Sequence, residues 1–176
     1  MKYLLDTLSV LLLALLALQD FKYRGISWYL LPLLFISLLM QALTSNSFQN
    51  IVFWFALNLL FVFLQMVLLL IYFGVKEKRF VNIINTKIGI GDILFFIVIG
   101  VSFSNINFIF FYLLGLLFTL LAVLVYYLIS RKPIGDIPLA GSIALLLIIC
   151  IFCRCFYTPF NFYDDAFLLH VFLPSP

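Results

Sequence analysis

Long, almost uninterrupted apolar segments constrain this chain more strongly than any other feature of its sequence. Of its 176 residues, 66% are hydrophobic and 10% are charged, whereas about 25% of the residues in a typical soluble domain are charged. Six apolar segments are present, and several of them approach the roughly 20 residues that a helix needs to cross a bilayer. They are expected at about residues 3–19, 26–43, 51–75, 91–103, 108–130 and 137–156. Because backbone polar groups in lipid must pair within their own segment, we predict an all-α, polytopic membrane bundle of six transmembrane helices.

The two ends of the chain differ in composition. Residues 1–156 are predicted to form one membrane domain, and residues 157–176 a C-terminal tail that is too interrupted by proline to span. Lys2 is the only basic residue before the first apolar run, and no small-residue cleavage site follows that run. A secretory signal peptide has a basic N-terminal region and a small-residue cleavage site, so we expect this run to be retained as the first helix.

Basic residues are distributed unevenly among the predicted loops. Eight of the ten Lys and Arg residues lie in the first, third and fifth loops, and the second and fourth loops have none. Because such an excess marks the cytoplasmic side of a membrane, both termini and the tail are expected outside. Arg154 is the exception within a predicted helix, and we expect it to extend toward the outer headgroups. The net charge of +3 therefore indicates topology in a lipid bilayer, and nucleic acid is not expected as a partner.

Three acidic residues are expected at the cytoplasmic ends of the helices. Asp20 ends the first segment, Asp92 opens the fourth and Asp136 opens the sixth. A carboxylate at membrane depth is costly, so a chain that keeps one usually has a use for it. For Asp92 and Asp136, the alternative is a structural role as a helix N-terminal cap or dipole partner. For Asp20, at a helix C-terminus that disfavours an anion, the alternative is neutralisation by nearby basic residues.

Two glycines distinguish Asp92 from the other acids. Gly89 and Gly91 remove side chains beside it, so another backbone can approach closely. Asp20 and Asp92 could then meet if their two helices pack together. They are the favoured candidate pair for a functional site.

Three cysteines lie together near the end of the last segment, at Cys150, Cys153 and Cys155. Their spacing could suggest a metal or redox site. A zinc site usually needs four ligands, and the run holds no fourth Cys and no His. We favour ordinary small apolar residues packed in a helix, and predict neither a metal nor a cofactor.

With both acids placed, the sequence resembles the type IV prepilin peptidases, in the short form that consists of the membrane peptidase domain alone. One family motif, an Asp followed by basic positions and Ile-Pro-Asn, is similar to residues 20–26, with Ser27 and Trp28 in place of Pro and Asn. A second motif, Gly-x-Gly-Asp-x-Lys, is similar to residues 89–94, with Leu94 in place of Lys. A weaker pattern, Ile-Pro followed by small and apolar residues, is similar to residues 137–141.

The resemblance implies an aspartic endopeptidase with a catalytic dyad of Asp20 and Asp92, supported by Gly89 and Gly91. It implies cleavage of the leader of a prepilin or pilin-like precursor at the cytoplasmic face of the bacterial inner membrane. The longer members carry an N-terminal region linked to methylation, to which nothing here is similar, so no methyltransferase activity is expected. Lys22 and Arg24, which are topology-determining charges, could face lipid phosphates or, less simply, the leader.

A second hypothesis comes from another class of protein. Intramembrane acids also mark ion pathways, so the chain could be a non-catalytic membrane component or a small ion-coupled transporter. Asp20, Asp92 and Asp136 would then line the path. A peptidase needs the carboxyl groups of Asp20 and Asp92 side by side, whereas an ion path would make Asp136 matter as well.

Overall fold

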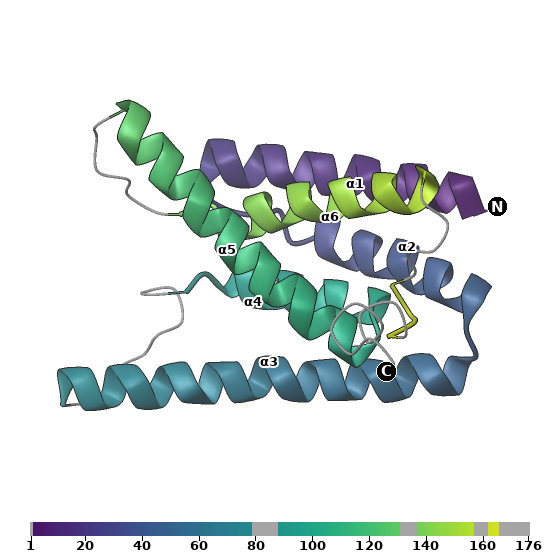
Figure 1. Cartoon of the computed structure of the whole chain (residues 1–176), viewed down its shortest axis with the longest axis horizontal. Coiled ribbons are helices and arrows are strands. Elements are labelled where there is room, and N and C mark those ends of the chain that lie inside the picture. Colours follow the sequence, from purple (N-terminus) through teal and green to yellow (C-terminus); the bar gives the residue numbers. More distant parts are fainter. Residues whose placement is uncertain (1, 79–87, 131–136, 157–161, 166–176) are drawn as a thin grey trace, which may run out of the picture.

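The chain folds into a bundle of apolar helices. The structure, a computed structural model, describes residues 2–78, 88–130, 137–156 and 162–165. This part of the chain is all-helical, as predicted, and consecutive helices run in opposite directions (Figure 1). In chain order the elements are α1 (Lys2–Tyr23), α2 (Leu30–Ser45), α3 (Phe48–Glu77), α4 (Ile90–Ile99), the 3-10 turn η1 (Gly100–Ser102), α5 (Asn105–Ser130) and α6 (Leu139–Phe156).

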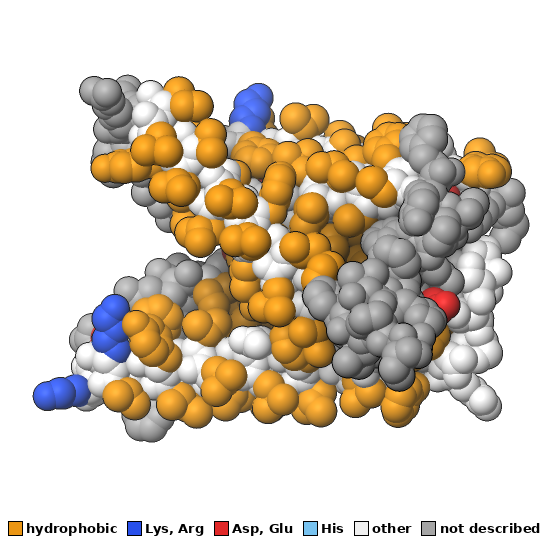
Figure 2. All heavy atoms as spheres, viewed as in Figure 1, with side chains coloured by type: hydrophobic (Ala, Val, Ile, Leu, Met, Phe, Trp, Pro, Cys, Tyr) orange, Lys and Arg blue, Asp and Glu red, His pale blue; other side chains and the backbone are white. Residues whose placement is uncertain are grey.

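The lengths of the helices bear on how many of them cross a membrane. Three of them, α1, α3 and α5, are long and apolar enough to do so, and α2, α4 and α6 are apolar but shorter. Apolar side chains are spread over the described part of the face seen in Figure 2, and many large hydrophobic residues are exposed, as expected of a lipid-facing exterior. The membrane character predicted from the sequence is therefore supported.

Helices α1 and α6 make the most extensive contact in the bundle and lie along one side of it, with α2 packed on α1, α5 on α6, and α4 between α2 and α6 (Figure 1). Between the ends of these helices the core is apolar. Its fully buried side chains include Leu13 and Leu16 of α1, Leu34 of α2, Phe95 of α4, and Ile143 and Leu147 of α6.

Helix α4 ends earlier than the apolar run that contains it. With η1 it covers about 21 Å at 1.5 Å per α-helical and 2.0 Å per 3-10 residue, against about 30 Å of hydrocarbon. The irregular backbone that follows is buried in protein, where its carbonyl groups need partners. The Asn58 side chain of α3 supplies them, because its amide group donates to the carbonyl oxygens of Gly100 at 2.9 Å and Phe103 at 3.0 Å.

Replacing Asn58 with leucine is expected to destabilise the bundle by about 2–4 kcal/mol. The side chain is similar in size, but the change leaves two buried carbonyl groups without their donor, at about 1–3 kcal/mol each. The measurement is the free energy of unfolding in mixed detergent micelles. Leu60, exposed on the same helix, provides the control: Leu60→Ala, which adds no polar group to the lipid-facing surface, should cost far less. An Asn58→Leu variant as stable as the wild type would contradict this role.

The described part of the tail packs onto the bundle at the end opposite the predicted cytoplasmic face. Phe162 and Tyr163 are buried in the core. The carbonyl oxygen of Phe162 accepts from the backbone N–H of Ser104 at 2.9 Å, and the Asn107 side chain donates to the carbonyl oxygen of Asp164 at 2.9 Å. Residues 162–165 thus pack on the link between α4 and α5 and hydrogen-bond to it. The division of the chain at residue 156 stays a prediction.

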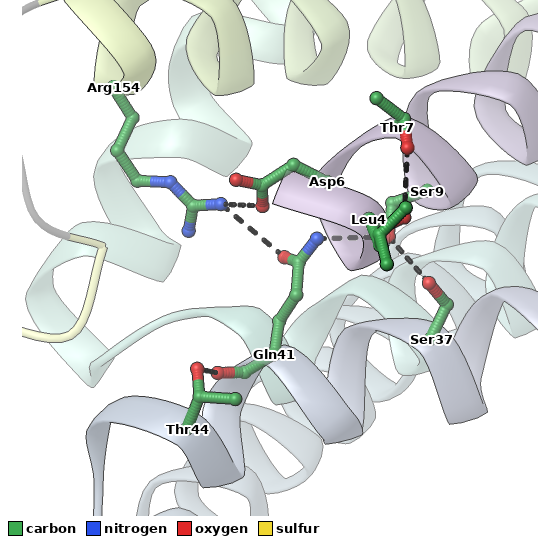
Figure 3. Close-up of polar contacts among 8 residues, drawn as sticks. All are labelled: Leu4, Asp6, Thr7, Ser9, Ser37, Gln41, Thr44 and Arg154. Carbon is green, nitrogen blue, oxygen red and sulfur yellow. Dashed lines mark hydrogen bonds and ion pairs between the residues drawn. The ribbon is translucent and has the colours of Figure 1, made fainter. Parts of the chain in front are cut away.

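A buried polar cluster lies at this same end, and it corrects one expectation. Arg154 does not extend toward the headgroups, because its guanidinium group pairs with the Asp6 carboxylate, and the two side chains are 8% and 7% exposed (Figure 3). Each buried charge thus has an opposite charge beside it, although Oδ2 of Asp6 and Nε of Arg154 have no hydrogen-bond partner among the described residues. Gln41 extends the cluster by donating to Ser9 at 3.1 Å, and Ser9 shares a 2.7 Å hydrogen bond with Ser37 (Figure 3).

Candidate active site

Asp20 lies in the last turn of α1, which continues beyond the predicted end at residue 19. Its side chain is buried, and its Oδ2 accepts a hydrogen bond of 2.7 Å from the backbone N–H of Gly141, at the start of α6. Arg24 ends the helix in the left-handed conformation, with φ of 54°, and its N–H donates to the Asp20 carbonyl oxygen at 3.0 Å. The hydrogen bond from Gly141 shows that the Asp20 carboxylate points inward, toward α6.

Asp92 lies in the first turn of α4 and is half-buried. Its Oδ1 accepts from the backbone N–H of Ala140 at 3.1 Å. The sequence left open a role for Asp92 at the N-terminus of its own helix, but Gly89 occupies the cap position there, without a side-chain cap bond. The Asp92 carboxylate nevertheless takes part at that N-terminus, because it accepts a hydrogen bond from the backbone of Gly89 as well as from α6.

The two carboxylates converge because Ala140 and Gly141 are adjacent, with Cα atoms about 3.8 Å apart. The N–H groups in the first turn of a helix have no partner within it, and the helix dipole is positive there. In α6, the N–H of Leu139 donates to Ile137 at 2.9 Å and that of Ser142 to Pro138 at 3.1 Å. The acids of α1 and α4 take the two amides in between, so every amide of this turn is satisfied.

Glycines make room at three points around this site. A Cβ atom at Gly89 would lie 3.1 Å from Oδ2 of Asp92, and one at Gly91 would lie 3.3 Å from Cδ1 of Ile26. At Gly141 it would lie 3.0 Å from Oδ2 of Asp20. The sequence predicted that Gly91 allows a close backbone approach. The group that approaches is the side chain of Ile26, in the connection after α1.

The departures from the family motifs have defined positions. The backbone N–H of Ser27 donates to Oε1 of Gln19 at 3.0 Å, a bond that proline at this position could not make. Trp28 and Leu94 are exposed on the surface. The hydrogen bonds of the Asp20 and Asp92 carboxylates to α6 involve none of these three residues.

The basic residues and the remaining acid occupy different positions. Lys22 and Arg24 are exposed near Asp20 in the chain, and Lys76 and Lys78 are exposed at the end of α3. The Lys and Arg side chains visible in Figure 2 lie toward this end of the bundle. Asp136 lies outside the described residues. Whether it joins the other two acids therefore stays untested.

Within the described residues, no group of three or more His, Cys, Asp or Glu side chains could hold a metal ion. Cys150 is a half-buried free thiol and Cys153 an exposed one. The latter therefore faces the surroundings of the bundle and is not packed in its core. The side chain of Cys155 lies outside the described set.

Sequence reasoning missed the part that the first turn of α6 plays. Residues 137–141 were singled out by resemblance, with no role assigned. The available signal was Pro138 shortly before the small residues Ala140 and Gly141, since proline is favoured at the first positions of a helix. A proline at this position indicates the start of a helix, where backbone N–H groups have no partner within the helix. It does not indicate which acids those N–H groups bind.

Comparison with known proteins adds no relative. No family model matches the chain, and neither a curated protein nor a solved structure does.

Proposed function

We propose that this protein is a membrane-embedded aspartic endopeptidase whose catalytic groups are Asp20 and Asp92. One observation carries the proposal: carboxylates from two different helices bind the backbone amides of adjacent residues, Gly141 and Ala140. Two acids brought to one point are the minimum that aspartic proteolysis requires. One oxygen atom of each carboxylate is held by α6, and the Asp92 carboxylate also accepts a hydrogen bond from the backbone of Gly89. A water molecule held between the two carboxyl groups would complete the site.

The chemistry follows from the proximity of the two acids. Two neighbouring carboxyl groups cannot both ionise cheaply, so the pair shares one proton at working pH. The ionised member takes a proton from water, which attacks the peptide carbonyl. The protonated member donates a hydrogen bond to the carbonyl oxygen and later a proton to the leaving amine. The apparent pKa values belong to the pair, so neither role is assigned to one residue.

The position of the site supports a membrane-inserted substrate. Asp92 is half-buried at the end of the bundle where exposed basic residues gather, so water can reach it from the side that charge counting assigns to the cytoplasm. A substrate cut there carries a short cytoplasmic leader before an apolar helix, as a prepilin-like precursor does. In this proposal all six helices lie in the bacterial inner membrane with both termini outside.

The buried residues between the two ends of the bundle favour a peptidase over an ion pathway. On α1, the polar positions Ser9 and Asp20 are separated by buried Leu13, Leu16 and Ala17. On α6, buried Ile143 and Leu147 lie at corresponding depths. An ion path needs polar groups or water along its length. In the described core, an apolar layer lies between the two ends of the bundle, where an ion path would need polar groups.

The test is cleavage of a candidate prepilin by the purified chain in liposomes. The wild type should release the leader, and the double variant Asp20→Asn/Asp92→Asn should release none. Asp164→Asn, an equivalent change in an exposed residue at the other end of the bundle, should cleave like the wild type. Full cleavage by the double variant would exclude the dyad.

A further inference from the structure

Resting on that proposed function, we propose that the first turn of α6 is a third part of the active site and that Gly141 is a positioning residue for Asp20. Two observations meet at Gly141. Its amide holds one oxygen of the Asp20 carboxylate at 2.7 Å. Its missing side chain leaves the space that this carboxylate occupies.

The geometry explains why this position is glycine. A Cβ atom there would lie 3.0 Å from Oδ2 of Asp20, 3.2 Å from its Cβ and 3.4 Å from the carbonyl oxygen of Ala17. All three atoms belong to α1, and one of them is backbone. Small residues at Gly141 and Ala17 allow the two helix backbones to approach closely. A methyl group at residue 141 would therefore push the Asp20 side chain away from the α6 amide.

Ala140 positions Asp92 in the same way, but only through its backbone N–H. Its own side chain is buried and does not separate its N–H from Oδ1 of Asp92, at 3.1 Å. Because both amides belong to one rigid turn, the separation of the two carboxylates is set by the helix and does not depend on either side chain's rotamer freedom. Fixing catalytic groups in this way avoids an entropic cost during the reaction.

The experiment compares Gly141→Ala with Gly115→Ala in the cleavage assay. Gly115 of α5 is also tightly packed against α6, because a Cβ atom there would lie 3.1 Å from Cγ1 of Ile143, but it does not touch the acids. Gly141→Ala should lower kcat about 100-fold with little change in KM, since a displacement of about 1 Å has effects of this size. Gly115→Ala should lower thermal stability without a comparable loss of kcat.

A second variant keeps the test decisive if Gly141→Ala does not fold. Ala140→Pro removes the N–H group from which Asp92 accepts its hydrogen bond, and it leaves residue 141, beside Asp20, unchanged. Proline is tolerated in the first turn of a helix. It should also lower kcat. Three results would each overturn the positioning role without contradicting the proposed peptidase activity. They are a wild-type kcat in folded Gly141→Ala, equal losses of kcat in Gly141→Ala and Gly115→Ala, and a wild-type kcat in Ala140→Pro. If the wild type cleaves no precursor, both proposals fail.

Discussion

Replacing Asp92 alone with asparagine is expected to reduce precursor cleavage by about 10³-fold or more, while the bundle stays folded. Asparagine keeps the shape of aspartate, and its Oδ1 can still accept the hydrogen bond from the Ala140 amide. The start of α6 therefore stays capped. The lost property is the ionisable carboxyl group, and general acid–base catalysis is worth about 10² to 10⁴ in rate.

The comparison with Asp92→Ala separates chemistry from structure. Alanine removes both the acid and the acceptor, so this variant should lose activity and also about 1 kcal/mol of stability, the typical cost of a lost helix cap. Initial cleavage rates and thermal unfolding measured on the same preparations decide the matter. If Asp92→Asn cleaved like the wild type and only Asp92→Ala were impaired, Asp92 would be a cap for α6, and the peptidase account would be wrong.

Replacing Arg154 with methionine is expected to destabilise the protein by about 3–5 kcal/mol. The change leaves the Asp6 carboxylate buried, with no opposite charge beside it among the described residues, and an unpaired buried charge costs about that much. Arg154 also lies over the ring of Phe162, 4.8 Å from its centroid, so the change weakens the docking of the tail. Denaturation in mixed micelles measures the loss.

The double variant Asp6→Leu/Arg154→Met is the control for this pair. Removing both charges should recover much of the lost stability, since well-packed apolar residues can replace a buried ion pair at little cost. Cys153→Ser, in an exposed residue next to Arg154, should have little effect. Stability unchanged in Arg154→Met would contradict the buried pairing. So would a double variant that is less stable than the single one.

The all-helical, apolar character of this bundle could be predicted because each helix is a continuous local feature of the sequence. The same holds for Asp20 and Asp92 as candidates, since their depth follows from where the apolar runs end and where basic residues gather. Local sequence also placed Asp92 at the start of a helix, and its carboxylate does contact the Gly89 backbone there, but its contact with α6 was not predicted.

The remaining features depend on contacts between distant residues. The end of α4 at Ile99 could not be predicted, because the apolar run continues and the stabilising side chain, Asn58, lies 42 residues before Gly100. The partner of Arg154 is 148 residues away. The amide that holds Asp20 is 121 residues away, and nothing in the spacing of one segment specifies a partner at such a separation.

The central claim is that the carboxyl groups of Asp20 and Asp92 share one site at the start of α6. The most direct measurement is their separation in a crystal structure of the full chain in a lipid phase. The account predicts Asp20 on the amide of Gly141 and Asp92 on the amide of Ala140, close enough for one water molecule to touch both. Carboxyl groups that face away from each other, or that lie at opposite ends of the bundle, would contradict it.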